Sequence, residues 1–163
     1  MTTSRTEHAG AAGGTGDPGR ELKALMDILA ASPGGEITAA AAALGKLPDA
    51  TPVRGPETGL VMLRGRIGGD GAPFNLGEAA VTRATVRLSG GAVGHAYALG
   101  QDREKARLSA VLAALWSEGN RREEILRDVL EPLAEARAAE TSRTRREAAA
   151  TRVDFFTMVR GDD

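Results

Sequence analysis

The sequence predicts one domain of the α+β class: an N-terminal helical hairpin, an antiparallel sheet of three or more strands, C-terminal helices and an apolar extended tail. Apolar residues recur at helical spacing before residue 45 and after residue 102, whereas β-branched residues alternate with others between them. The length of 163 residues suits a single core, which we assign to residues 20–163. Residues 1–19 are small, polar and glycine-rich, so we expect a disordered tail.

Two short helices are predicted first, over residues 21–31 and 37–44. The first is indicated by apolar side chains at i, i+3, i+4 and i+7: Leu22, Leu25, Met26 and Leu29. Such a pair also resembles a DNA-binding helix-turn-helix, but the second helix is mostly alanine and lacks side chains that reach base edges. Because the net charge is also only −1, we expect plain helix packing and no nucleic-acid partner.

Three strands are predicted over residues 60–67, 79–88 and 92–99, where β-branched or apolar residues alternate with others. The sequence "SGG" at 89–91 supplies a turn between the last two, which predicts an antiparallel meander. Residues 46–59 are expected to be a linker. The glycine-rich stretch 65–78, "GRIGGDGAPFNLGE", is expected to be a loop.

Helical spacing returns after residue 102. Asp102 is a candidate N-cap for a helix with one apolar stripe: Leu108, Val111, Leu112 and Leu115. A longer helix follows "SEGN", and we expect Pro132 to kink it. Its continuation to residue 152 is helix-prone but almost free of large apolar side chains, so it is solvated or covers a partner.

The C-terminal segment 150–163 is a candidate docking segment. Its apolar side chains lie on both faces of an extended chain: Val153, Phe155, Phe156, Met158 and Val159. Two interpretations stay open at equal weight. The segment folds back onto its own domain, or it docks on another subunit.

Four arginines are candidate phosphate- or phosphonate-binding residues: Arg64, Arg66, Arg83 and Arg87. Arg64 and Arg66 share a face of the first predicted strand, Arg83 and Arg87 share a face of the second, and antiparallel pairing could bring all four together. Guanidinium groups donate bidentate hydrogen bonds to such oxygens. The alternative is an ordinary solvated sheet face on which the arginines pair with Glu57 and Glu78.

Other site chemistries are disfavoured. The glycine-rich stretch lacks the Lys-Ser or Lys-Thr of a P-loop and is followed by a strand rather than a helix. His95, Tyr97 and Asp102 lie near each other without a serine nucleophile, so no catalytic residue is assigned. Without cysteine and with only two histidines, no metal site is expected. No apolar stretch spans a bilayer, so we expect a cytoplasmic protein without a membrane partner.

Three phrases resemble one family: "PETGLVMLRGRIGGDGAPFNLGEAAVTRATVRL", "GHAYALGQDREKA" and "TRVDFFTMVRGD". They are similar to the PhnG subunit of the bacterial carbon-phosphorus lyase system, over about residues 54–107 and 148–162. Gln101 stands where the family is expected to have a basic residue, which weakens an anion site there.

The resemblance implies a subunit of a cytoplasmic assembly for phosphonate catabolism. In that assembly PhnG, PhnI, PhnH and PhnL exchange the adenine of ATP for a phosphonate, and the radical SAM subunit PhnJ later cleaves the carbon-phosphorus bond. PhnI is expected to carry the nucleosidase chemistry. The resemblance implies no cofactor bound by this subunit, with ATP and alkylphosphonate as substrates of the complex. Two function classes remain: a required noncatalytic subunit, or a subunit with its own nucleotide or phosphonate site on the arginine face.

Overall fold

The computed structural model describes residues 17–68 and 71–151. Its elements in chain order are α1 (Pro18–Ala31), α2 (Gly34–Ala43), β1 (Ala50–Arg66), β2 (Pro73–Leu88), β3 (Val93–Leu99), α3 (Arg103–Glu118), α4 (Arg122–Ile125), the π-helical segment η1 (Leu126–Leu130) and α5 (Glu131–Ala150). The predicted α+β class and the antiparallel order β1-β2-β3 are confirmed. Residues 1–16 and the tail at 152–163, with the five docking candidates named above, lie outside the described residues.

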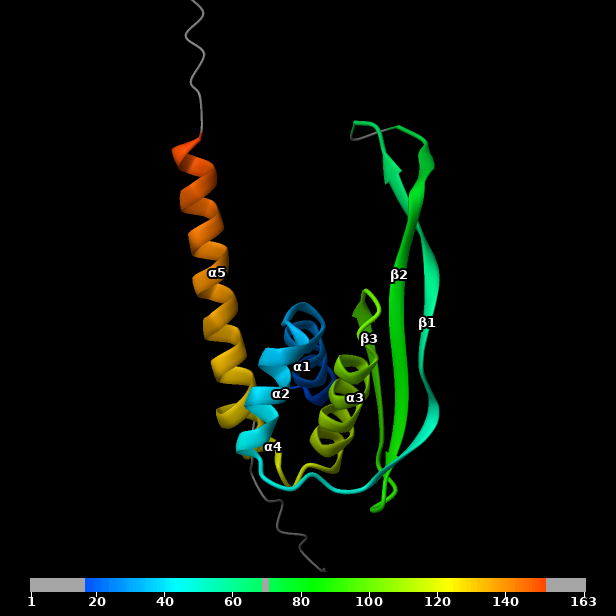
Figure 1. Cartoon of the computed structure of the whole chain (residues 1–163), viewed down its shortest axis with the longest axis vertical. Coiled ribbons are helices and arrows are strands. Elements are labelled where there is room, and N and C mark those ends of the chain that lie inside the picture. The colour runs from blue at the N-terminus through cyan, green and yellow to red at the C-terminus, as the bar shows by residue number, and fades with distance from the viewer. Residues whose placement is uncertain (1–16, 69–70, 152–163) are drawn as a thin grey trace, which may run out of the picture.

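The helices lie on one side of the sheet, with α3 directly against β2 and β3 (Figure 1). Helices α1 and α2 pack on α3, and α5 lies farther from the sheet, beyond them. The largest fully buried side chains come mainly from these helices: Leu25, Leu29, Ile37, Leu112, Leu115, Ile125, Val111 and Val129. The opposite face of the sheet has no helix over it in the described chain.

Helix α3 is held close to the sheet by small residues. Asp102 caps its N-terminus by accepting a hydrogen bond of 2.8 Å from the backbone N–H of Lys105, as predicted. A Cβ atom on Gly94 of β3 would lie 2.0 Å from the carbonyl oxygen of Ala110. The same Cβ atom would lie 2.5 Å from the backbone nitrogen of Ala114, and because neither backbone atom can swing away, only glycine permits this approach.

Helix α1 begins at Pro18, before the predicted start at residue 21. Asp17 accepts a hydrogen bond of 3.1 Å from the backbone N–H of Gly19, and Pro18 occupies the first turn, where its missing N–H has no intrahelical partner to lose. Pro18 and Gly19, which the sequence assigned to the disordered tail, therefore belong to a capped helix. The predicted boundary is corrected here.

Strands β1 and β2 are longer than predicted. Residues 50–59, expected to be a linker, belong to β1, and most of the expected glycine-rich loop belongs to the two strands. Pro52 and Pro56 are tolerated because β1 lies at the edge of the sheet, and the register shifts around them mark bulges. The described part of the glycine-rich stretch is thus the far end of the β1–β2 hairpin.

The last helix changes its geometry just before Pro132. The change is a wider, π-helical turn and not the simple kink that the sequence predicted. The π-helical segment η1 immediately precedes α5, in which Pro132 lies in the first turn. A proline cannot donate to the carbonyl four residues back, and its ring crowds that carbonyl, so a π-turn accommodates it. Beyond Leu133 the described part of α5 is exposed, as the sequence predicted.

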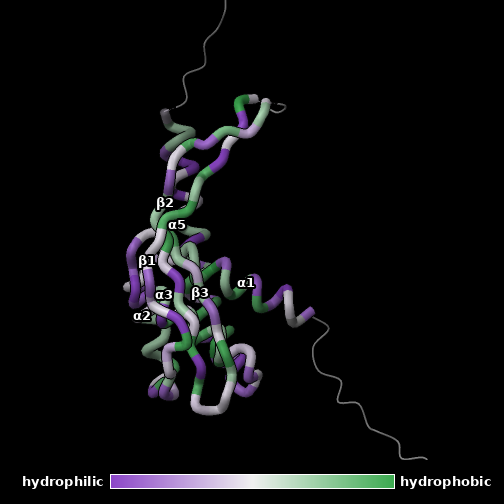
Figure 2. The backbone as a smooth tube through the Cα atoms, turned by 90° about the vertical axis from the view of Figure 1, so that its right-hand side faces the viewer, coloured by the Kyte–Doolittle hydropathy of each residue, from purple (hydrophilic) through white to green (hydrophobic). Residues whose placement is uncertain are grey.

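The β1–β2 hairpin extends well beyond the end of β3 (Figures 1 and 2). The pairing of β2 with β3 ends at Val81, opposite Leu99, whereas the pairing of β1 with β2 continues to Arg66, opposite Pro73. We call the two strand segments 60–66 and 73–80 the arm. In Figure 1 the arm and α5 rise on opposite sides of the helices that cover the sheet.

Candidate functional site

Arg83 is the centre of a polar cluster on the uncovered face of the sheet. Its register partners are Glu57 on β1 and Tyr97 on β3. The Nε atom of Arg83 donates a hydrogen bond of 2.7 Å to Oε1 of Glu57, and Nε of Arg54 lies 3.2 Å from the same oxygen. One carboxylate therefore bridges two guanidinium groups, which fixes Arg83 on the face.

The electrostatics of the cluster keep Arg83 fully charged. The hydrogen bond from Arg83 to Glu57 raises the pKa of the guanidinium above its ordinary value, and Tyr97 adds to the rise. The side chain of Arg83 remains 39% exposed, so solvent reaches it. Glu57 pairs with Nε of Arg83 and Tyr97 is its other hydrogen-bonding neighbour, so part of the donor capacity of this five-donor guanidinium remains for an anion.

Two neighbouring positions extend the polar face along the strands. The Thr85 hydroxyl lies 3.2 Å from Nδ1 of His95, its register partner on β3. Arg87 is exposed, and within the described chain no ion pair involves it. His95 hydrogen-bonds Thr85 and makes no hydrogen bond with Asp102, which instead caps α3.

The expectation that pairing gathers all four candidate arginines is wrong. Arg83 and Arg87 lie opposite Glu57 and Thr51, in the part of the sheet that the helices cover from behind. Arg64 and Arg66 lie opposite Asn75 and Pro73, at the far end of the arm. The hairpin turn comes after Arg66, so the two pairs of arginines lie near opposite ends of the hairpin.

The alternative for Arg83 is confirmed in one respect, because it does pair with Glu57. Glu78, the other carboxylate expected to pair, makes no ion pair among the described residues. The contribution of Arg54 was missed, since residue 54 lies in a stretch that the sequence assigned to a linker. Arg54 and Glu57 are three positions apart, so in a regular strand their side chains would point to opposite faces. The bulge between them changes this, and the sequence does not reveal a bulge.

The cluster borders a shallow hollow of about 280 Å³ that continues toward the arm, lined by Glu57, Thr58, Gly59, Leu60, Val61, Val81, Arg83 and Tyr97. Its lining combines the apolar side chains Leu60, Val61 and Val81 with the polar groups of Arg83, Tyr97 and Glu57. This arrangement can hold a phosphate, phosphonate or carboxylate group against Arg83.

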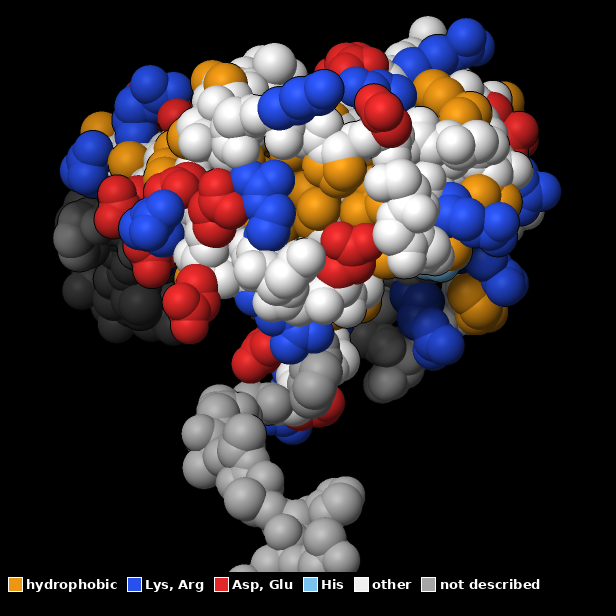
Figure 3. Space-filling view, turned by 90° about the horizontal axis from the view of Figure 1, so that it is seen from below, with side chains coloured by type: hydrophobic (Ala, Val, Ile, Leu, Met, Phe, Trp, Pro, Cys, Tyr) orange, Lys and Arg blue, Asp and Glu red, His pale blue; other side chains and the backbone are white. Residues whose placement is uncertain are grey.

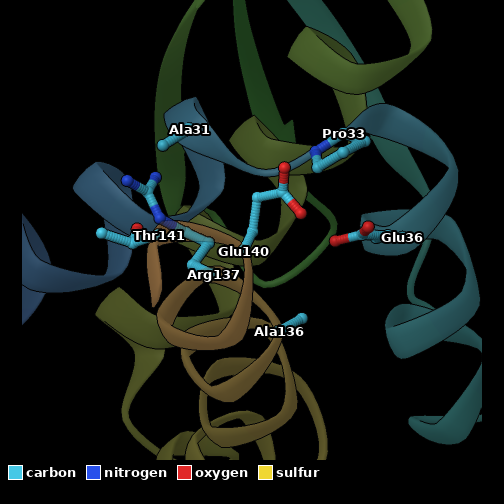
Figure 4. A pocket seen from close by; sticks show the side chains of 7 residues that line it. All are labelled: Ala31, Pro33, Glu36, Ala136, Arg137, Glu140 and Thr141. Carbon is cyan, nitrogen blue, oxygen red and sulfur yellow. The ribbon is translucent and has the colours of Figure 1, made fainter. Parts of the chain in front are cut away.

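A second hollow, of about 470 Å³, lies where the α1–α2 turn faces α5 (Figure 4). It presents Glu36 from α2 together with Arg137 and Glu140 from α5, so two carboxylates accompany one guanidinium. Glu140 is itself held by Arg143 at 2.7 Å. Nearby, burial lowers the pKa of Lys105, which donates a hydrogen bond of 2.7 Å to the carbonyl of Ala30. This mixed charge does not favour an anion.

Other kinds of site find no support in the described chain. Residues 17–68 and 71–151 contain no group of three or more His, Asp or Glu side chains placed to hold a metal ion. In the same ranges no helix is long and apolar enough to cross a membrane. The face of the molecule shown in Figure 3 has Lys and Arg interspersed with Asp and Glu, so no extended basic surface marks that face.

Comparisons with known proteins give a consistent result. A family model described as phosphonate metabolism protein PhnG matches residues 20–161. The chain is also 54% identical over 138 residues to a protein of Rhizobium meliloti (strain 1021) named alpha-D-ribose 1-methylphosphonate 5-triphosphate synthase subunit PhnG. That alignment covers 85% of this chain and 88% of the relative.

Proposed function

We propose a function from one premise: the chain belongs to the PhnG family of phosphonate metabolism proteins. We infer that it is a subunit of an alpha-D-ribose 1-methylphosphonate 5-triphosphate synthase, the complex named for its relative in Rhizobium meliloti. The observation that carries this proposal is the 54% identity over nearly the whole of both chains. The complex takes ATP and methylphosphonate and displaces adenine during phosphonate catabolism in the cytoplasm.

The reaction of the complex is a ribosyl transfer. The bond between adenine and ribose breaks, and an oxygen of the phosphonate forms the new bond to the same ribose carbon, with the triphosphate kept at the other end. We propose PhnI, PhnH and PhnL as partners in this step, with PhnI carrying the nucleosidase chemistry and PhnJ acting later. The tail residues 153–159 stay proposed as a segment that docks on a partner.

We place this chain in the complex as a required subunit without catalytic residues of its own. The polar cluster around Arg83 has donors for an anion, and although the Thr85 hydroxyl lies 3.2 Å from Nδ1 of His95, no carboxylate among the described residues hydrogen-bonds His95 to orient it as a base. Such a subunit supports the reaction by positioning partners or substrate oxygens. We expect no cofactor to be bound by this chain.

A second candidate function rests on the remaining donor capacity of Arg83 and on exposed Arg87. These groups could bind the triphosphate of ATP or a phosphonate directly. A calorimetric titration of the isolated chain with ATP and with methylphosphonate distinguishes this candidate function from the noncatalytic role. Saturable binding that Arg83→Gln abolishes supports a site on this chain, and absence of binding supports the noncatalytic subunit.

Adenine release tests the main proposal. The other synthase subunits are prepared with and without this chain, and ATP with methylphosphonate is supplied. We expect release only when this chain is present, and none from the chain alone. Release by the isolated chain, free of other subunits, would contradict a noncatalytic role, and full release without it would contradict the proposed function.

A further inference from the structure

The arm exposes large apolar side chains on both of its faces. Leu60 is 67% exposed and Met62 is 51% exposed on the face that continues the helix-covered side. On the other face, Val61 is 41% and Leu63 is 45% exposed. Phe74 and Leu76 from β2 add to the exposed apolar surface. No part of the described chain covers either face.

The arm also lacks the support that a sheet normally gives. It has two strands only, because β3 ends opposite Val81. Apart from Ala80, whose carbonyl accepts a hydrogen bond of 2.8 Å from the backbone N–H of Gly100, both of its backbone edges are open in the described chain. A two-stranded hairpin is marginally stable in water by itself. An exposed apolar ribbon of this kind is typical of a surface that becomes buried in a protein–protein interface.

A charge feature accompanies the apolar surface. Arg64 and Arg66 are exposed at the far end of the arm, and no ion pair among the described residues involves them. Elsewhere in the described chain some arginines pair with a carboxylate one helical turn away, as Arg107 does with Glu104 and Arg121 with Glu124. The arm thus presents two guanidinium groups beside an apolar ribbon, and neither has a carboxylate partner among residues 17–68 and 71–151.

We propose that the arm inserts into an apolar groove on a different subunit of the synthase, and that carboxylates at the rim of that groove pair with Arg64 and Arg66. This inference rests on the proposed function. A groove covers both faces of the ribbon, whereas edge-to-edge pairing with a second copy of this chain covers an edge and leaves both faces in water. Each arm carries Arg64 and Arg66 but one carboxylate, Glu78, so self-pairing of two arms would gather four guanidinium groups with only two carboxylates from the arms.

The first test removes the apolar anchors. Met62→Ser with Leu63→Ser changes one side chain on each face of the arm, and Val53→Ser with Leu126→Ser is the control, because Val53 is 53% and Leu126 is 45% exposed outside the arm. Each variant is coexpressed with the other synthase subunits, and their copurification is measured. We expect the arm variant to recover about tenfold less partner or worse, and the control to match the unaltered chain.

The second test uses charge, which leaves the ribbon's packing intact if the serine variant fails to fold. Arg64→Glu with Arg66→Glu should weaken copurification, and most strongly at low salt. Arg145→Glu with Arg146→Glu on exposed α5 is the control and should have no effect. The thermal midpoint of each free variant identifies any loss of folding.

Three outcomes would overturn the inference. Normal copurification of both arm variants would show that the arm is not buried in the complex. A dimer of the free unaltered chain that both arm variants convert to a monomer would show that the occupant is a second copy. If the unaltered chain copurifies with no subunit at all, the proposed function fails and the inference fails with it, which distinguishes that case from the first.

Discussion

Strand β2 passes through two environments, and the comparison shows where this chain is complete and where it is not. From Thr82 to Leu88 its side chains alternate between a buried face against α3 and a solvated face with Arg83. From Pro73 to Glu78 every side chain is exposed, including Phe74 and Leu76. The first part is stabilised by the chain's own helices. The second has the same pairing with β1 but nothing that covers it.

The covered half and the arm should therefore differ in their sensitivity to substitution. In the covered half a lost side chain leaves a cavity that the fold cannot close. In the arm it leaves only a smaller exposed surface. Four pairs of substitutions compare a position in the covered half or at its boundary with an exposed counterpart, from the largest expected effect on the stability of the free chain to the smallest.

The largest effect is expected from truncating a leucine. Leu112 of α3 is fully buried, so Leu112→Ala should lower the free energy of unfolding by about 2–5 kcal/mol. Leu76 in the arm is 63% exposed, and Leu76→Ala should change the free energy of unfolding by less than about 0.5 kcal/mol. Urea denaturation of both variants measures the difference. Equal losses would mean that the arm belongs to the chain's own core.

Adding a methyl group gives the second comparison. A Cβ atom on Gly94 would lie 2.0 Å from the carbonyl oxygen of Ala110, so Gly94→Ala should cost about 1–3 kcal/mol as α3 is forced from the sheet. Gly59, at the base of the arm, has no atom within 4 Å of such a Cβ atom. Gly59→Ala should be tolerated. A neutral Gly94→Ala in the same thermal melts would show that α3 sits farther from β3.

Much of the covered half could be predicted from sequence, because its signals are local. The stripe in α3, the cap at Asp102 and the alternation in β3 each depend on neighbours along the chain. The extra length of β1 could not be predicted from sequence. Its residues Pro52, Gly55 and Pro56 favour a linker unless the strand is known to lie at the edge of the sheet. An edge strand needs hydrogen bonds on one side only, so its prolines are harmless.

The arrangement of the arginines could not be predicted for a related reason. Alternation tells which residues share a face of a strand, but register depends on the length of the turn and on bulges. Leu76 is the extra residue of one bulge, because Leu63 lies opposite Gly77 and Arg64 lies opposite Asn75. The sequence predicted strands at 60–67 and 79–88 with a long loop between them, and such a register would bring Arg64 near Arg83. The actual turn is shorter, because Arg66 pairs with Pro73, and this register separates the two pairs of arginines.

The junction between the two halves gives the third comparison. Thr82 is fully buried there, donates a hydrogen bond of 2.8 Å to the carbonyl of Gly100 and lies 2.9 Å from the Thr58 hydroxyl. Thr82→Val should cost about 0.5–1.5 kcal/mol, because the Gly100 carbonyl loses its donor. The exposed Thr51→Val is the control and should have little effect. If both variants melt alike, this bond does not anchor the end of β3.

The smallest effect on folding is expected from Arg83→Gln. The Arg83–Glu57 pair lies on the solvated face, where ion pairs contribute little to stability, so the thermal midpoint should hardly move. Synthase turnover in the assembled complex should nevertheless fall if Arg83 contacts a substrate or partner anion. Arg143→Gln on α5, which also removes an exposed pair, is the control. Full turnover with Arg83→Gln would show that Arg83 contacts no substrate or partner anion and that this sheet face is simply exposed to solvent.

Hydrogen exchange along β2, followed by mass spectrometry in the free chain and in the purified synthase, tests the central claim most directly. In the free chain we expect slow exchange at residues 82–88 and fast exchange at residues 73–80, since only the first stretch is covered by helices. In the complex residues 73–80 should become as protected as residues 82–88. Strong protection of both stretches in the free chain, or fast exchange of residues 73–80 within the complex, would contradict the view that a partner subunit completes the arm.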